Sequence, residues 1–248
     1  MSGLIGALSA LTRLPVPAGV GEDPGRALPW FPLVGVLVGL ATASVYAAAY
    51  QVLPQLVSAA VAILTLVLLT GALHEDGLAD SADGWGGGHG RDDTLRIMRD
   101  PQQGTFGTLA IVFSVVLRIG ALAALSPAFS LVALPAVHAV SRAVPVALMT
   151  LTPAARDEGQ AAHFTSAATP ARAAVAAGSA LVVAIVLLGV WVIAAVAIAI
   201  GSAWLIRRAA IQRLGGLTGD VLGATEQLVE CGLLLLLAGV AHSAIPSA

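Results

Sequence analysis

The sequence predicts an all-helical integral membrane protein. Its 248 residues are 58% hydrophobic and only 10% charged, and the mean hydropathy is +0.91. Soluble domains carry about 25% charged residues, so this composition is typical of a chain that crosses a membrane repeatedly. The apolar runs approach the roughly 20 residues that a bilayer requires. They leave no room for a large soluble domain, and we expect one membrane domain over residues 1–248.

Seven helical spans are expected along the chain. Five are continuous apolar runs: Leu33–Leu53, Leu56–Leu73, Phe106–Leu125, Phe129–Leu151 and Val221–His242. A further 34 residues between Arg172 and Arg207 carry no formal charge, which is too long for one ordinary span, so we divide them near Gly189 into two. A different division of that segment, or of the last one, would give six or eight spans. The proline-rich chain before Leu33 is expected to lie at the membrane interface.

The charges between these spans predict the orientation. Segments 1–32, 74–105, 152–172 and 207–220 carry ten of the twelve basic residues, all of them arginine, whereas the turns near Pro54, Pro127 and Gly189 carry none. With seven spans, the four charged segments fall on one face. Because arginine excess marks the cytoplasmic side, we expect the functional loops on the cytoplasmic side of the membrane.

Composition also excludes several classes of function. A net charge of -2 argues against nucleic acid as a partner. The single cysteine, Cys231, excludes an internal disulfide and a cysteine-based metal site. The first residues lack the basic start of a secretory signal peptide.

The candidate chemistry lies in the acidic segment His74–Asp100, which holds seven of the fourteen acidic residues. Asp76, Asp80 and Asp83 stand at i, i+4 and i+7, so a continuation of the second span into 74–83 would place them on one helix face. Clustered carboxylates suit Mg²⁺ or Mn²⁺, and the flanking glycines allow a phosphate to approach closely. The alternative is a solvated loop with capping aspartates.

The segment 91–107 predicts a short amphipathic helix that ends at Pro101. Arg96 and Arg99 could pair with phosphate, and Asp100 could complete a metal site. Gly104 and Thr105 begin the next span, where backbone N–H groups can hold an anion. The alternative is an interfacial helix whose arginines contact lipid headgroups.

Several polar residues fall near or inside predicted spans. Thr218 and Asp220 stand at a helix start, where Asp220 is either a cap or a substrate ligand. Glu226 and Glu230 lie within the last span, and acids there cost roughly 2.5–3.5 kcal/mol each at its centre. Arg118 and Arg142 either form ion pairs with these glutamates or bind an anionic substrate; the residues themselves do not decide between the two.

Together these motifs resemble the cobalamin synthase family, also called adenosylcobinamide-GDP ribazoletransferases. The matching blocks run in family order over nearly the whole chain, and jointly they are specific. They are Thr12–Pro17, Phe31–Gly35, the H-x-D-G-L-A-D-x-x-D-G motif at His74–Gly84, Ile97–Asp100, Gly104–Gly107, Ser141–Arg142, and Gly215–Asp220 with Gly223, Ala224 and Glu226. Glu75 departs from the family, where an apolar residue is usual, as does the Pro101–Gln103 turn.

The resemblance implies an enzyme that joins α-ribazole or its 5′-phosphate to adenosylcobinamide-GDP and releases GMP, with Mg²⁺ required. We expect metal binding and catalysis from Asp76, Asp80, Asp83 and Asp100. The candidates for substrate binding are His74, Arg96, Arg99, Gly104, Thr105, Arg142, Thr218, Asp220 and Glu226, with Arg156, Glu158 and Gly159 as secondary candidates. The partners are then the two small molecules and the lipid bilayer, with a homo-oligomer or an association with other cobalamin-assembly enzymes as further expectations.

Two other functions compete with this one. A CDP-alcohol phosphotransferase would use similar carboxylate chemistry, but no Ala-Arg follows Asp83-Gly84 at the spacing which that signature requires. A transporter would spread its polar residues over both faces of the bundle, whereas here they concentrate on one face.

Overall fold

The computed structural model describes residues 2–16, 23–156 and 158–243, and it is a bundle of helices. The elements are α1 (Ser2–Leu11), α2 (Pro24–Ala27), η1 (Leu28–Trp30), α3 (Phe31–Ala49), α4 (Gln55–Thr70), α5 (Leu73–Gly87), α6 (Arg91–Ile97), α7 (Thr105–Ala123), α8 (Pro127–Leu151), α9 (Gln160–Ala167), α10 (Pro170–Leu188), η2 (Gly189–Trp191), α11 (Val192–Leu214) and α12 (Gly219–Ser243). In the described ranges the β pairing consists of one isolated bridge, Ala154 to Leu217. The predicted all-helical membrane fold is therefore confirmed. Pro17, which ends the opening motif, lies outside the described residues.

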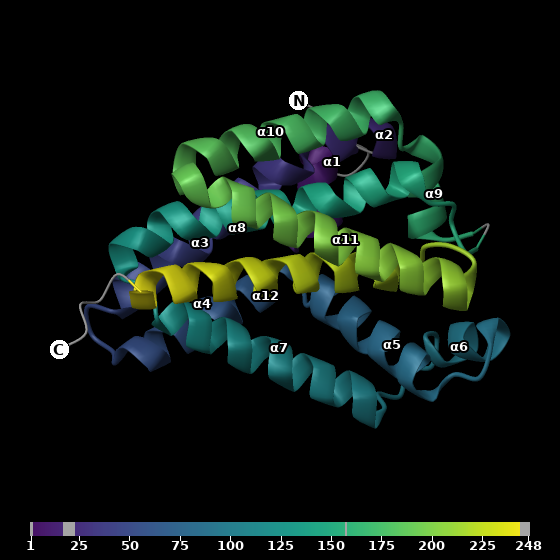
Figure 1. Ribbon diagram of the computed structural model, residues 1–248, viewed down its shortest axis with the longest axis horizontal. Helices are drawn as coiled ribbons and strands as arrows, with labels where there is room; N and C mark the ends of the chain where they lie inside the picture. The colour runs from purple at the N-terminus through teal and green to yellow at the C-terminus, as the bar shows by residue number, and fades with distance from the viewer. Residues whose placement is uncertain (1, 17–22, 157, 244–248) are drawn as a thin grey trace.

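The expected number of seven spans is not confirmed. Among the described residues five helical stretches are long and apolar enough to cross a membrane, and a sixth results if α4 and α5 are taken together. The predicted break at Gly189 is present, because α10 ends there and α11 runs back in the opposite direction (Figure 1). Judged by length and composition, however, the stretch Pro170–Leu214 that contains both helices counts as one candidate membrane span.

The second predicted span does not continue straight into residues 74–83. Gly71 and Ala72 both adopt left-handed backbone conformations, with φ of 68° and 58°, and α5 leaves α4 at an angle of 87°. Gly71 ends α4 as a C-terminal glycine, a position where positive φ is common. Residues 74–83 are helical as predicted, but they belong to a separate polar helix, which we place outside the membrane-spanning segments.

Close helix packing holds the centre of the bundle. A Cβ at Gly35 would lie 2.1 Å from the carbonyl oxygen of His138, and one at Gly39 would lie 2.5 Å from that of Leu134. Only glycine permits so close an approach of α3 to α8, as the Gly-x3-Gly spacing indicates. This packing fixes α8, and with it the polar side chains that α8 turns toward α12.

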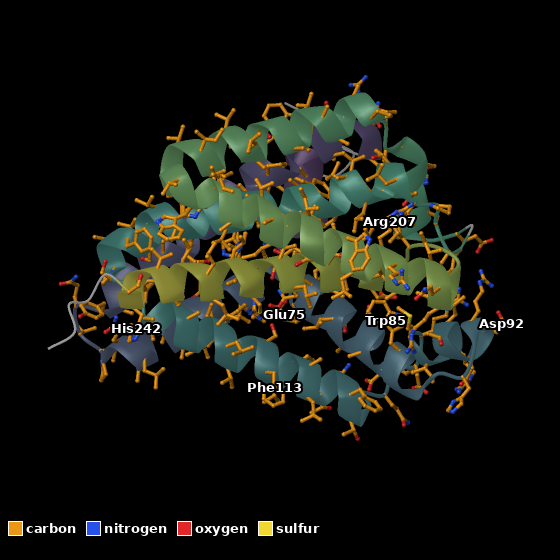
Figure 2. The ribbon with its side chains drawn as sticks, in the orientation of Figure 1. Glu75, Trp85, Asp92, Phe113, Arg207 and His242 are labelled. Atoms are coloured by element: carbon orange, nitrogen blue, oxygen red, sulfur yellow. The ribbon has the colours of Figure 1, made fainter. Side chains whose placement is uncertain are left out.

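The charged loops gather at one end of the molecule. Figure 1 shows α6, α9, the beginning of α7 and the beginning of α12 on the right, whereas the turn between α7 and α8 and the C-terminus lie on the left. Asp92, Trp85 and Arg207 mark the charged end in Figure 2, and His242 marks the other. The segregation of charge that the sequence predicts is therefore present in the fold.

Candidate active site

A polar cleft opens at the charged end, between α5 and the beginning of α12. It encloses about 240 Å³. Its lining residues are Leu73, Asp76, Gly77, Arg156, Glu158, Gly159, Ala161, Ala162, Leu217, Thr218, Gly219 and Asp220. The cleft thus brings together candidates from three distant segments, including the secondary candidates of the 156–159 loop.

Two loops form one wall of the cleft because they pair with each other. The backbone N–H of Ala155 donates to the Leu217 carbonyl at 2.7 Å, and that of Leu217 donates to the Pro153 carbonyl at 2.8 Å. A Cβ at Gly216 would lie 2.5 Å from the Pro153 oxygen, so the pairing requires glycine there. Arg91 ties the loops to α6 by donating to the Leu214 and Ala155 carbonyls at 2.9 and 2.8 Å. These contacts hold both loops at the mouth of the cleft.

Glycine also sets the distance between α5 and α12. A Cβ at Gly77 would lie 2.7 Å from the backbone oxygen of Asp220, and one at Gly223 would lie 3.3 Å from the Cα of His74. The two helices therefore touch through their backbones. As a result Asp76 on α5 and Asp220 on α12 line the same cleft, although they are far apart in the sequence.

The carboxylates on α5 interact strongly. Burial and, after it, the nearby carboxylates of Asp76, Asp220 and Asp83 together raise the pKa of Asp80 to about 7. Crowded acids of this kind are stabilised by a cation, and carboxylate oxygens are the ligands that Mg²⁺ prefers. Asp76, Asp80 and Asp220 therefore fit a divalent cation by the chemistry of their donor atoms.

Positive charge lies on the opposite side of the cleft. Burial lowers the pKa of Arg156, and the nearby guanidinium of Arg99 lowers it as well, whereas Asp220 has the opposite effect. Arg156 also donates to the Leu95 carbonyl at 3.1 Å, which fixes its position. Two arginines beside an acidic cluster suit a phosphate group that bridges a cation and guanidinium groups.

Asp83 has a contact that the sequence did not indicate. Its carboxylate accepts hydrogen bonds from the backbone N–H groups of Gly104 and Gly107, both at 2.8 Å. Asp83 therefore caps α7, and two of the N–H groups that we expected to hold an anion are occupied by this side chain. Metal binding by Asp83 stays a prediction, as does substrate binding by Thr105, which is exposed at the start of α7.

The α6 region places the remaining candidates at the surface. Arg96 pairs with Asp93 at 2.7 Å and is 68% exposed. Asp100 accepts from the backbone N–H of Gln102 at 2.9 Å, and it is not among the carboxylates that raise the pKa of Asp80. The helix ends at Ile97, shortly before Pro101. The roles expected for Arg96 and Asp100 stay predictions.

A second polar group is buried in the middle of the bundle. It consists of Glu75 on α5, Arg118 on α7, His138, Ser141 and Arg142 on α8, and Glu226, Gln227 and Glu230 on α12, with His74 at its edge. Figure 2 shows Glu75 between α12 and α7. Each of these nine side chains is at most 6% exposed, so their hydrogen bonds are made mainly to one another. Four of their buried atoms, Glu75 Oε2, Arg118 Nε, His138 Nε2 and Arg142 Nε, have no hydrogen-bond partner among the described residues.

Both intramembrane arginines form ion pairs within this group. Arg118 donates to Glu230 at 3.1 Å and to Glu75 at 2.9 Å. Arg142 donates to Glu226 at 2.8 Å, and Ser141 donates to the same carboxylate oxygen at 2.9 Å. The ion-pair interpretation of the four residues is therefore confirmed.

Sequence reasoning missed Glu75 and His138 as members of this group. His138, Glu226 and Glu230 have ligand atoms within 4.8 Å of one another, a spacing that could hold a metal ion. In this structure the two glutamates pair with arginines, Glu226 with Arg142 and Glu230 with Arg118, and Arg118 is shared with Glu75. The unusual acid at position 75 was the available signal, because an unpaired acid beside a span is costly and Arg118 needed a partner.

His74, Arg142 and Glu226 also line a second, mainly apolar cavity of about 100 Å³ that adjoins the cleft. The Nδ1 atom of His74 lies 3.5 Å from the carboxylate of Glu226, which Arg142 holds from the other side. Of the predicted substrate-binding residues, these three are thus brought together. They lie deeper in the bundle than Asp76 and Asp220.

Comparison with known proteins identifies the family. Residues 3–238 match the family described as cobalamin-5-phosphate synthase. Proteins named adenosylcobinamide-GDP ribazoletransferase are 41% identical in Azorhizobium caulinodans, over 92% of both chains, and 43% identical in Bradyrhizobium diazoefficiens, over 94% of this chain and 91% of the relative. A relative of the same name in Ralstonia nicotianae is 41% identical over 93% of this chain and 92% of its own. No solved structure matches the chain. By family and by relatives along nearly its whole length, the chain is a transferase of the cobalamin-5-phosphate synthase family.

Proposed function

We propose that this protein transfers the cobinamide phosphate of adenosylcobinamide-GDP to α-ribazole or to its 5′-phosphate. The products are GMP and adenosylcobalamin or its 5′-phosphate. The observation that carries the proposal is the cleft at the charged end, where acidic α5 faces Asp220 and Arg156. The family and the names of the relatives supply the reaction class.

The chemistry is a displacement at phosphorus. A ribose hydroxyl oxygen forms a bond to the cobinamide-side phosphorus, and the bond from that phosphorus to the bridging oxygen breaks. GMP leaves with the bridging oxygen, and the hydroxyl proton is released. The reactants carry several negative charges, so the site must neutralise the diphosphate and exclude competing attack by water.

The residues of the chain divide this work between the two sides of the cleft. Mg²⁺, for which Mn²⁺ could substitute, would neutralise the diphosphate and polarise its phosphorus when bound. Asp76 and Asp80 would hold it, with Asp220 across the cleft. Arg156 and Arg99 would bind the phosphate that leaves with GMP, because guanidinium groups match phosphate oxygens in geometry.

The location follows from the same arrangement. The cleft lies at the end of the bundle that carries the arginine-rich loops, which favours the cytoplasmic side of a bacterial inner membrane. Both proposed substrates are polar, and a cytoplasmic cleft would receive them without passage across the bilayer. Self-association and association with other cobalamin-assembly enzymes stay predictions.

The exchange Asp80→Asn tests the proposed function directly. It removes one charge from the acidic cluster without changing the shape of the side chain, so we expect the protein to insert and fold but to lose GMP release. The matched control is Asp92→Asn, an exposed acid on α6 that is not among the carboxylates that raise the pKa of Asp80. Normal turnover by Asp80→Asn would exclude Asp80 from the reaction and contradict the proposed metal site on α5.

A further inference from the structure

The inner cavity beside the cleft has mainly apolar walls and a polar floor whose charged groups are paired with each other. Leu11, Met149 and Leu222 form part of the walls, together with Phe31 and Phe164, whose ring centroids lie 5.7 Å apart at an interplanar angle of 59°. The polar floor is His74, Arg142 and Glu226. The ion pair between the last two, at 2.8 Å, neutralises this floor.

The cavity and the cleft are neighbours that share part of their lining. Leu73, Ala161 and Gly219 line both spaces. Glu226 at the floor and Asp220 in the cleft are six residues apart on α12, which corresponds to about 9 Å along the helix axis. A ligand of nucleoside length can therefore have one end in the cavity and the other in the acidic cleft.

We propose that this cavity binds the benzimidazole base of α-ribazole and so aligns the ribose hydroxyl with the cleft. The inference rests on the proposed function and extends it to the recognition of one substrate. The base is planar, aromatic and largely apolar, and it gains from burial against Phe31, Phe164 and Met149.

The other parts of the two substrates fit this cavity less well. The diphosphate would lose its hydration against apolar walls, where the guanidinium group of Arg142 is already paired with Glu226. Guanine is planar, but its polar edge would have to compete for His74, Arg142 and Glu226, which are already paired with one another. The corrin ring is far larger than a cavity of about 100 Å³. Of these groups, the base of the nucleoside best combines a flat shape with low polarity, and the cavity can hold one of its rings.

The volume also defines how far the base enters. An apolar cavity of about 150 Å³ binds benzene, so about 100 Å³ holds no more than one ring. The outer ring edge of the base would fill the cavity, while the ring fused to it lies in the shared opening near Ala161. The ribose then lies in the cleft, where Asp76 and Thr218 can reach its hydroxyl groups.

The experiment fills the cavity from two independent helices. Ala161→Phe on α9 and Ala10→Phe on α1 each place a ring in the space that the base would occupy. Matched controls are His163→Phe and Ser9→Phe, which add the same ring at exposed positions of the same helices. The measurements are the KM for α-ribazole, the KM for adenosylcobinamide-GDP, and binding of α-ribazole alone by calorimetry. Free 5,6-dimethylbenzimidazole, the base of α-ribazole, serves as a competitive inhibitor.

We expect both cavity variants to raise the KM for α-ribazole at least about tenfold, as is typical when an apolar pocket no longer accepts a group. In Ala10→Phe, whose position lines the cavity but not the cleft, the KM for adenosylcobinamide-GDP should stay within twofold. The controls should behave as wild type, and the free base should inhibit wild type but not the cavity variants. A wild-type KM for α-ribazole in both cavity variants, or equal effects in the controls, would overturn the assignment. If the free base does not compete with α-ribazole, the cavity has another occupant, such as an acyl chain. Wild-type protein that neither binds α-ribazole nor releases GMP would instead refute the proposed function itself.

Discussion

Removal of Arg118 should destabilise the protein more than any surface change. Its side chain is fully buried and donates to two carboxylates, Glu230 at 3.1 Å and Glu75 at 2.9 Å. In Arg118→Met the volume is nearly preserved, but both carboxylates lose their cation inside the bundle. Removal of one partner of a buried ion pair costs about 3–5 kcal/mol, because the remaining charge is desolvated and unpaired.

The assay is unfolding of the purified protein in detergent, by heating and by titration with SDS, followed by tryptophan fluorescence. The control is Arg96→Met, whose ion pair with Asp93 is exposed and screened by solvent, so its stability should be close to that of wild type. A free energy of unfolding for Arg118→Met within about 1 kcal/mol of wild type would refute the reasoning, since the buried pairs would then contribute little.

A second variant separates charge from packing. Replacing Arg118, Glu75 and Glu230 together by methionine removes the buried charges along with their partner, and such replacements are often neutral or stabilising. We therefore expect the triple variant to recover most of the stability that Arg118→Met loses. If it is no more stable than the single variant, the loss comes from packing and not from unpaired charge.

Three further predictions follow from the site and its surroundings. Asp83→Ala removes the cap of α7 and should cost about 1 kcal/mol of stability; an unchanged unfolding temperature would contradict this. The pKa of Asp80 is raised from 3.8 to about 7, so its contribution to stability is fully present below pH 3.8 and is lost as the pH rises through 7. Without divalent cations, wild type should therefore lose stability toward pH 8 relative to Asp80→Asn, and Mg²⁺ should remove the difference; equal pH profiles would contradict the crowding of the carboxylates. The orientation can be tested with an impermeant maleimide. The cysteine of Ser166→Cys should react only in inverted vesicles, and that of Ala128→Cys only in intact cells. The reverse result would place the cleft outside the cell.

The sequence was sufficient for the helical fold because its main signals are local. Runs of apolar residues mark the spans, and charge marks their ends. The bend between α4 and α5 was not predicted, because it depends on the left-handed conformation of Ala72. No residue pattern at that position indicates this conformation. Helical periodicity alone describes 74–83 equally well as a continuation of α4 or as a separate helix.

The site was predictable in its residues but not in their partners. Asp76, Asp80 and Asp220 were identifiable from spacing and motif, and the structure places Asp76 and Asp220 in one cleft. The capping of α7 by Asp83 and the pair of Glu75 with Arg118 join segments far apart in the chain, so neither is visible in local sequence. Such contacts depend on how helices pack, which only the three-dimensional structure provides.

The most direct test of the proposed function uses the purified protein in liposomes with adenosylcobinamide-GDP and α-ribazole, with Mg²⁺ or with EDTA. The proposal predicts GMP release that requires both substrates and the metal, with an equal amount of adenosylcobalamin formed. Absence of GMP from folded protein in the presence of Mg²⁺, or release that continues unchanged in EDTA, would contradict metal-assisted phosphoryl transfer in the acidic cleft.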